Sequence, residues 1–200
     1  MSDAVEARSP ETLLDESEIA ACVGRLAGEI GAAHPDGVVL VGVLKGASIF
    51  LADLARALDG IDVQIAFIAI SRYAPDSGRV RILHDVDLDL EGRDVVVVED
   101  LVDTGLTLGY LVAHLQSRGA HRVEVCTLLD RSVRRILPLD VRYVGVEIPD
   151  VFVLGYGLHR ADLYRNLPRV VVADAELVRD RPDAYVGALY GVGSPRDPRC

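Results

Sequence analysis

Residues 95–108, VVVVEDLVDTGLTL, combine an apolar run with acidic residues that could bind a ligand. The four valines predict a buried strand, and Glu99 and Asp100 follow it directly. In an open parallel sheet, this end of a strand presents ligand-binding groups. The transfer of an ionised carboxylate out of water without a partner costs free energy, so we expect both side chains to face an opening.

A turn of small residues follows the two acids and leads into a predicted helix from Thr104 to about Ser117. The N–H groups at a helix start favour a phosphate, and the neighbouring carboxylates suit vicinal sugar hydroxyls. The pattern therefore predicts a site for a phosphorylated ribose. The alternative is that the first two turn residues only cap the helix, which leaves the two acids unexplained. The turn residues are Asp103, Thr104, Gly105 and Thr107.

Short apolar runs alternate with amphipathic stretches along most of the chain. Strands that are apolar on both faces and alternate with helices predict an α/β fold with a parallel sheet covered on both sides. The expected strands are 38–44, 63–70, 95–98, 123–129 and 141–148, and a further helix is expected over about 49–58.

The remaining segments are assigned from their composition. Ser9 and Pro10 precede apolar residues at helical spacing, which predicts one helix reaching about Gly31. Residues 71–83 contain a cluster of Pro, Asp, Ser and Gly and predict a mobile hairpin or lid. Residues 191–200 are rich in Gly, Pro and charge and predict a disordered tail.

Composition excludes several classes of protein. A chain of 200 residues with a net charge of −10 is one acidic domain, which disfavours general binding to nucleic acid. The three cysteines, Cys22, Cys126 and Cys200, have no metal or disulfide spacing and suggest a reducing compartment. The chain shows neither a signal peptide nor a spanning segment, so we expect a cytoplasmic protein without a membrane partner.

The 95–108 stretch resembles the phosphoribosyl-pyrophosphate (PRPP) signature of type I phosphoribosyltransferases. Its form EDxxDTGxT is similar to the 6-oxopurine branch of that family. Other segments, including VGVLKGASIFLADL, CTLLDRSVRR and LYRNLP, resemble the family in order from Val38 to about Val172. The resemblance implies one domain over residues 1–190, with a parallel sheet, a mobile lid hairpin and a small hood made of the N-terminal helix and residues 149–190.

The resemblance also implies a reaction. In this family, PRPP with Mg²⁺ is attacked at ribose C1 by a purine nitrogen, pyrophosphate leaves, and hypoxanthine or guanine becomes IMP or GMP. A cis peptide bond before Lys45 and a homo-oligomer, either dimer or tetramer, are implied as well. The implied roles are Asp103 as the base at purine N7; Glu99 and Asp100 for the ribose and metal; Thr104, Gly105 and Thr107 for the 5′-phosphate; Lys45, Gly46 and Arg165 for pyrophosphate; Arg131, Phe152 and Val153 for the purine; and Ser71 and Tyr73 for the lid.

The chain departs from the family pattern in three places. Arg131 stands where lysine usually meets the purine 6-oxygen, and a guanidinium fork does not match an ammonium in length or width. His159 stands where an aspartate helps to hold magnesium, and Asp162 could replace that aspartate if the segment is helical. An extra Arg72 lies within the lid segment.

These observations leave three hypotheses open. The first is a 6-oxopurine phosphoribosyltransferase of purine salvage. The second is a paralogue that acts on a purine analogue, such as a deazapurine, in a biosynthetic pathway. The third is a PRPP-sensing regulator that binds RNA or DNA, which the acidic charge and the presence of Asp103 disfavour.

Overall fold

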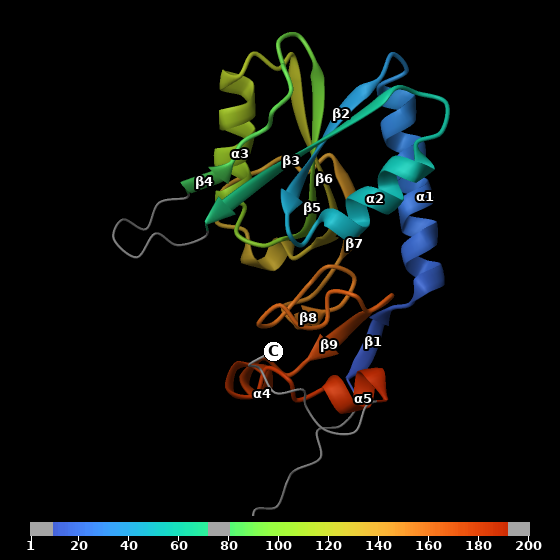
Figure 1. Cartoon of the computed structure of the whole chain (residues 1–200), viewed down its shortest axis with the longest axis vertical. Coiled ribbons are helices and arrows are strands. Elements are labelled where there is room, and N and C mark those ends of the chain that lie inside the picture. Colours follow the sequence, from blue (N-terminus) through green and yellow to red (C-terminus); the bar gives the residue numbers. More distant parts are fainter. Residues whose placement is uncertain (1–9, 72–80, 192–200) are drawn as a thin grey trace, which may run out of the picture. The chain divides into compact units, whose positions relative to one another are not determined.

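The computed structural model describes residues 10–71 and 81–191, which form two compact units. The larger unit is Ser17–Asp150, and the described residues of the smaller unit are 10–16 and 151–191. Each unit is built around its own β-sheet (Figure 1). Within the described ranges, no helix combines the length and the apolar character needed to cross a bilayer.

The larger unit contains a six-stranded sheet in the order β4-β3-β2-β5-β6-β7. All neighbouring strands are parallel except β4, which pairs antiparallel with β3 at one edge. Helices α1 and α2 cover one face of the sheet, and α3 covers the other (Figure 1). The element bounds are β2 Val38–Leu44, β3 Val63–Ser71, β4 Arg81–His84, β5 Asp94–Val102, β6 Arg122–Asp130, β7 Tyr143–Glu147, α1 Glu16–Ala33, α2 Ser48–Ala57 and α3 Leu106–Ser117.

The central strands are buried on both faces, as their continuous apolar sequences predict. Successive side chains of a strand point to opposite faces of the sheet. Val39 and Val95 therefore join an apolar cluster with Leu111 of α3. Leu40 and Val96, one residue further along their strands, are fully buried on the other face. The strand predictions at 38–44, 63–70, 95–98, 123–129 and 141–148 are thus confirmed, but β5 continues past the predicted end at residue 98, so that Glu99 and Asp100 lie within the strand and do not follow it.

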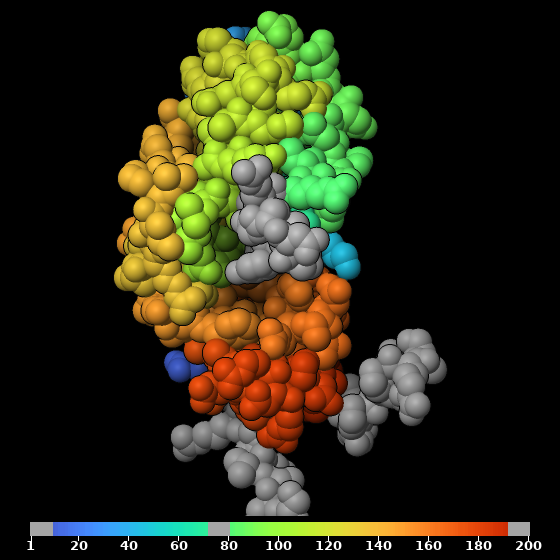
Figure 2. Space-filling model, turned by 90° about the vertical axis from the view of Figure 1, so that its left-hand side faces the viewer, coloured from blue at the N-terminus to red at the C-terminus, as the bar shows by residue number. Residues whose placement is uncertain are grey.

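The predicted hairpin is present as the antiparallel pair β3 and β4. Residues 72–80, which include the predicted lid residue Tyr73, lie outside the described residues, and so does the predicted tail after residue 191. In Figure 2 the segment that follows β4 lies beside α3. Arg118, the residue directly after α3, donates hydrogen bonds to the carbonyls of Val86 and Leu88. These bonds tie the carboxyl end of α3 to the segment that follows β4.

The smaller unit has a three-stranded antiparallel sheet in the order β1-β9-β8. Leu154, Tyr164 and Val171 are at the centre of its apolar cluster. Asp174 caps α4 by accepting hydrogen bonds from two backbone N–H groups of the first turn. The bounds are β1 Glu11–Leu14, β8 Phe152–Leu154, β9 Val170–Ala173, α4 Ala175–Asp180 and α5 Val186–Tyr190.

The N-terminal segment differs from the sequence prediction. We expected one helix from Ser9 and Pro10 onward that would contribute to the hood. Residues 11–14 instead form β1, which pairs with β9, and α1 begins only at Glu16 and groups almost entirely with the larger unit. Pairing with a strand some 160 residues away along the chain overrides the local helical spacing. The periodicity of the sequence does not reveal such a distant pairing.

Candidate functional site

Glu99 and Asp100 lie near the carboxyl end of β5, the strand between β2 and β6. Both are largely withdrawn from solvent, with only 5% and 7% of their surfaces exposed. Asp100 accepts a hydrogen bond from the backbone N–H of Leu101 at 2.8 Å. Buried carboxylates are costly unless they are bonded or bind a ligand, so this pair marks the end of β5 as a candidate binding site. Our expectation that both acids face an opening is not tested by these contacts.

The loop after β2 lies against these acids because β2 and β5 are neighbours in the sheet. The Leu44–Lys45 peptide bond is cis, as the family resemblance implies. Gly46 comes so close to Asp100 that a Cβ atom at position 46 would lie 2.6 Å from its Cγ. Ser48 donates its hydroxyl to the carbonyl of Lys45 at 2.8 Å. The structure therefore brings together the predicted pyrophosphate loop and the predicted ribose and metal acids.

The turn that follows β5 is anchored by its backbone. Gly105 occupies the N-cap position of α3 with φ +79°, a conformation that favours glycine, and it offers no side-chain cap. The helix therefore starts two residues later than predicted. Thr104 Oγ1 accepts a bond from the N–H of Leu106 at 3.4 Å, while the carbonyl of Thr104 accepts two bonds from residues 136 and 137.

This geometry bears on the capping alternative. The capping alternative holds in part for Thr104, whose Oγ1 accepts the N–H of Leu106, whereas the N-cap residue itself is Gly105 and has no side-chain cap. The N–H groups of the first turn of α3, with Thr107 half-buried beside them, suit an anion. The turn retains the features expected of a phosphate site.

Asp103 meets Arg131 across the gap between the ends of β5 and β6. Arg131 Nη1 lies 3.0 Å from Asp103 Oδ1, and Arg131 is only 4% exposed. Arg135 adds a second cation: it donates to the carbonyl of Asp103 at 3.0 Å and pairs with the carboxylate of Asp130. Sequence reasoning did not identify Arg135 or Asp130, although the charged run DRSVRR directly after a buried strand was a usable signal.

The smaller unit holds the other predicted purine residues. Phe152 is half-buried and Val153 is buried in β8, where they pair with Ala173 and Val172 of β9. Each is thus held by regular strand pairing within its own unit. Their contacts with a purine remain predictions.

The loop 155–165 is irregular, and this corrects one prediction. If this segment were helical, Asp162 would lie on the same side as His159 and could replace the missing aspartate. Asp162 instead has a left-handed backbone with φ 60°, and its N–H donates to His159 Nδ1 at 3.0 Å. Its carboxylate pairs with Arg165 at 2.9 Å, and Arg165 also donates to the carbonyl of Gly157 at 2.6 Å. The two residues do lie together, but through a tight turn rather than a helix.

These contacts change how the loop could bind a metal. Since His159 Nδ1 accepts a hydrogen bond, that nitrogen is not available to a metal ion. Mg²⁺ prefers oxygen ligands in any case. Within residues 10–71 and 81–191, no three His, Cys, Asp or Glu side chains are grouped as a metal site. Asp100, which lies against Gly46, and its neighbour Glu99 carry carboxylate oxygens at the end of β5.

Ser71 ends β3, at the base of the hairpin. The role of Ser71 in a lid remains a prediction, because residues 72–80 lie outside the described residues.

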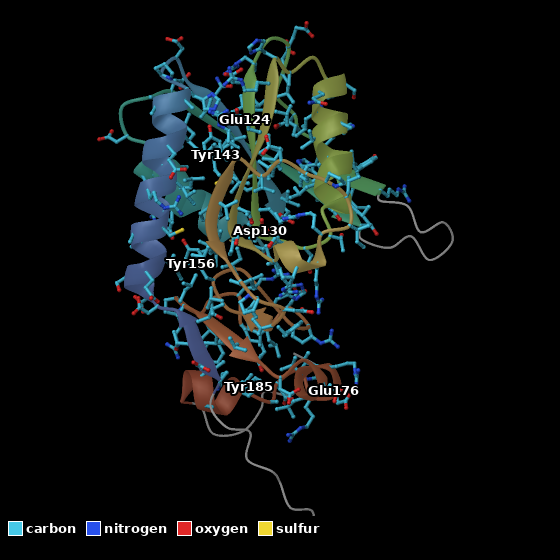
Figure 3. The ribbon with its side chains drawn as sticks, turned by 180° about the vertical axis from the view of Figure 1, so that it is seen from behind. Glu124, Asp130, Tyr143, Tyr156, Glu176 and Tyr185 are labelled. Atoms are coloured by element: carbon cyan, nitrogen blue, oxygen red, sulfur yellow. The ribbon has the colours of Figure 1, made fainter. Side chains whose placement is uncertain are left out.

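A polar group that the sequence did not predict lies at the opposite end of β6 from Asp130 (Figure 3). His34 is buried between two carboxylates, 3.1 Å from Asp94 Oδ2 and 3.0 Å from Glu124 Oε2. Tyr143 donates to the same Glu124 oxygen at 2.9 Å, and burial, reinforced by this carboxylate, raises the pKa of Tyr143 to about 12. We interpret the group as structural, because every member has a partner.

The chain was compared with known proteins. A model of the phosphoribosyl transferase domain matches residues 9–160. The chain is 43% identical to a hypoxanthine-guanine phosphoribosyltransferase of Mycobacterium avium over 81% of this chain and 84% of the relative. It is 41% identical to the Bacillus subtilis protein of that name over 81% and 92% of the two chains.

Solved structures of similar proteins have the same fold. A Bacillus anthracis hypoxanthine-guanine phosphoribosyltransferase, solved with a HEPES molecule in its active site, aligns with a TM-score of 0.80 and 38% identity over 84% of this chain and all of its own. A Trypanosoma cruzi hypoxanthine phosphoribosyl transferase aligns with a TM-score of 0.82 and 36% identity over 88% and 98%.

Proposed function

This chain belongs to the phosphoribosyltransferase family, and from that membership we propose that it transfers the 5-phosphoribosyl group of PRPP to hypoxanthine and guanine. The products would be IMP or GMP and pyrophosphate, which is a purine salvage reaction. The observation that carries the proposal is the contact between Gly46 and Asp100, on the strand that leads into the turn before α3. The N–H groups at the start of α3 suit a phosphate group, and the carboxylates of Glu99 and Asp100 suit sugar hydroxyls.

Each part of PRPP has a proposed partner in the larger unit. The first turn of α3 would hold the 5′-phosphate through Thr104, Gly105 and Thr107. Glu99 and Asp100 would accept hydrogen bonds from the ribose hydroxyls. Lys45 and Gly46 would bind pyrophosphate, with Arg165 of the smaller unit as a further partner. In the smaller unit, Phe152 would stack on the purine and Val153 would contact its edge.

Asp103 would act as the general base. As the lone pair of a purine ring nitrogen forms the bond to ribose C1, the bond from C1 to the pyrophosphate oxygen breaks and its electron pair leaves with pyrophosphate. The N7 proton of the base then passes to the Asp103 carboxylate, which completes the balance. Asp103 lies at the end of β5, next to the turn that would hold the sugar phosphate.

Magnesium fits the residues present. Glu99 and Asp100 supply carboxylate oxygens, and Mg²⁺ typically uses one or two carboxylates together with substrate phosphates. Bound there, the ion would neutralise charge on the pyrophosphate group.

We also propose that the two units are the core and hood of one domain over residues 1–190, that Ser71 and Tyr73 belong to a lid, and that the enzyme works as a homo-oligomer in the cytoplasm. The structure of the Trypanosoma cruzi relative addresses the role of its C-terminal region in its oligomeric state, which is a reason to test the assembly of this chain. Size-exclusion chromatography with light scattering would determine the assembly.

A second substrate class is favoured by one observation. Arg131 takes the place of the usual lysine and is held against Asp103, so the purine edge meets a different donor. The paralogue hypothesis, in which the base is a purine analogue such as a deazapurine, follows from this difference. No observation favours the nucleic-acid-binding regulator.

A panel of bases with PRPP and Mg²⁺ tests the proposal. We expect IMP and GMP to form, with higher kcat/KM for hypoxanthine or guanine than for any analogue. If folded protein that binds PRPP makes neither product, the proposal is rejected. If an analogue is preferred, the paralogue hypothesis replaces it.

A further inference from the structure

Two consecutive backbone carbonyls of the turn before α3 face the segment that follows β6. The carbonyl of Asp103 accepts a hydrogen bond from Arg135 Nη1 at 3.0 Å. The carbonyl of Thr104 accepts the backbone N–H groups of Ile136 and Leu137 at 3.0 and 3.1 Å. Three donors from one short segment therefore hold the same side of the turn.

The direction of these carbonyls sets the direction of the N–H groups next to them. A trans peptide unit is planar, and its N–H points away from its C=O. Both peptide units between residues 103 and 105 are trans. Because the carbonyls of Asp103 and Thr104 point toward residues 135–137, the N–H groups of Thr104 and Gly105 point away from that segment. The segment after β6 thus decides on which side the turn presents its donors.

Close packing holds the turn against the same segment. Gly105 has φ +79°, and a Cβ atom there would lie 3.0 Å from the carbonyl oxygen of Leu137 and 3.2 Å from Arg135 Cδ. Four residues later in α3, a Cβ atom at Gly109 would overlap the Leu137 side chain. The two glycines therefore allow the segment to contact both the turn and the start of the helix.

A buried acid fixes Arg135 itself. Arg135 Nη2 pairs with the carboxylate of Asp130, the last residue of β6, and the two side chains are only 17% and 8% exposed. The carbonyl of Asp130 accepts the backbone N–H of Ile148 at 2.8 Å, which anchors the acid to the segment after β7. The donors of a guanidinium have fixed directions, so Arg135 links the position of Asp130 to that of the Asp103 carbonyl.

We propose that Arg135 is a positioning residue for the 5′-phosphate of PRPP: it holds the Asp103 carbonyl so that the N–H groups of Thr104 and Gly105 are aligned for the phosphate. This inference rests on the proposed function and deepens it. Arg135 acts through the backbone of the turn, because its Nη1 and Nη2 both bind protein oxygens. Donors that are aligned before the ligand arrives bind it without the cost of ordering a loop.

Titration with ribose 5-phosphate tests the inference without any turnover. Arg135→Met keeps the approximate length of the side chain and removes its donors. We expect the dissociation constant for ribose 5-phosphate to rise about 10-fold, the usual effect of weakening a hydrogen bond to a charged group. The dissociation constant for pyrophosphate with Mg²⁺, whose proposed site is the loop after β2, should change less than about twofold. Equal losses for both ligands, or no loss for ribose 5-phosphate, would overturn the inference.

A double variant separates positioning from folding. Arg135→Met leaves the buried Asp130 carboxylate unpaired, so the midpoint of thermal unfolding should fall. Addition of Asp130→Asn removes the unpaired charge and should recover most of the midpoint, but it does not restore the donor to the Asp103 carbonyl. The double variant should therefore bind ribose 5-phosphate as weakly as Arg135→Met. Recovery of the affinity together with the midpoint would mean that Arg135 only stabilises the fold, which would contradict the proposal.

Arg135→Lys is the conservative variant. Its ammonium preserves the charge opposite Asp130, so the unfolding midpoint should stay close to that of the wild type. An ammonium does not reproduce the fork that spans the carboxylate and the Asp103 carbonyl, so the affinity for ribose 5-phosphate should lie between those of the wild type and Arg135→Met. Wild-type affinity in Arg135→Lys would contradict a role for the guanidinium.

The matched control is Arg134→Met, which removes the neighbouring arginine, whose partner is the exposed Asp150. Both dissociation constants should be unchanged in this variant. In turnover assays, Arg135→Met should raise the KM for PRPP about 10-fold and change kcat less than about threefold, because a phosphate held alike in the ground and transition states contributes uniform binding. A fall in kcat with an unchanged KM would contradict the proposal.

Failure of the proposed function has a different signature, because the titration needs no base. If neither hypoxanthine nor guanine is turned over but Arg135→Met weakens the binding of ribose 5-phosphate, the role of Arg135 stands and the proposed reaction falls. If the wild-type protein does not bind ribose 5-phosphate at all, the inference about Arg135 is overturned.

Discussion

Gly46 and Asp100 are in such close contact that the glycine leaves no space for a side chain. A Cβ atom at residue 46 would lie 2.6 Å from Asp100 Cγ and would overlap its carboxylate. Residue 46 follows β2 and residue 100 lies near the end of its parallel neighbour β5, so the sheet order brings the two together. The contact couples the proposed pyrophosphate loop to the proposed ribose site.

Gly46→Ala should therefore impair PRPP use. The added methyl group must displace either the loop or the carboxylate, and misplacement of about 1 Å in an active site can lower the rate about 10²-fold. Steady-state kinetics with PRPP as the varied substrate should show kcat/KM reduced by about that factor.

The control for this variant is Gly24→Ala in α1, where no atom lies within 4 Å of the new methyl group. Because alanine favours the helix, its free energy of unfolding should rise by about 0.5–1 kcal/mol with unchanged kinetics. Wild-type kinetics for Gly46→Ala would show that the contact has no functional role.

Asp103→Asn should lower kcat and preserve PRPP binding. An amide is nearly the same size as the carboxylate but cannot accept the base proton, and the loss of a general base typically costs 10²-fold or more. Calorimetric titration with PRPP and Mg²⁺ measures the binding, and turnover of hypoxanthine measures kcat. Unchanged turnover would remove Asp103 from the mechanism.

Arg131→Lys should change the choice of base and leave PRPP affinity unaltered. The ammonium is a compact point charge, so it cannot reproduce the fork of donors that Arg131 presents beside Asp103. The measurement is kcat/KM for each base of the panel. Identical base profiles for the two proteins would mean that the site tolerates either cation.

Tyr143 should make stability fall in alkaline solution. Its pKa is raised to about 12 by burial and by Glu124, whereas a tyrosine in the unfolded chain titrates near 10. The unfolded state then loses its proton first, so the free energy of unfolding decreases as pH rises from about 10 to 12. Urea denaturation across this range should show a smaller decrease for Tyr143→Phe than for the wild type.

The phenylalanine variant also loses the hydrogen bond to Glu124, which should cost about 1 kcal/mol at neutral pH. Tyr110→Phe, at an exposed tyrosine of α3, is the matched control and should retain the wild-type slope. Equal slopes for all three proteins would show that Tyr143 does not contribute.

Local sequence was sufficient for the strands of the larger unit. The run of valines in β5 is apolar on both faces, so its composition alone predicts a central strand that is buried on both sides. The same run locates Glu99 and Asp100, because the acids follow where the valines stop. The cis bond before Lys45 came from the family resemblance, and nothing in the residue types would have indicated it.

Local sequence failed where distant segments compete with it. Residues 11–14 have helical spacing but pair with β9, so hydrogen bonds to a distant segment decide their conformation. The turn at Asp162 differs, because its bonds are local: Asp162 is bonded to His159 and Arg165, and its left-handed backbone is not evident from the residue types.

The sequence by itself determined the parallel α/β core, the acids at the end of its central strand and the family to which the chain is similar. These features follow from the composition and order of the residues, because an apolar run is buried as a strand and an amphipathic stretch packs as a helix. The contact of Gly46 with Asp100 and the ion pair of Arg131 with Asp103 were decided only by the tertiary structure. Each joins residues from the ends of different strands, and strand order is set by packing of the whole sheet.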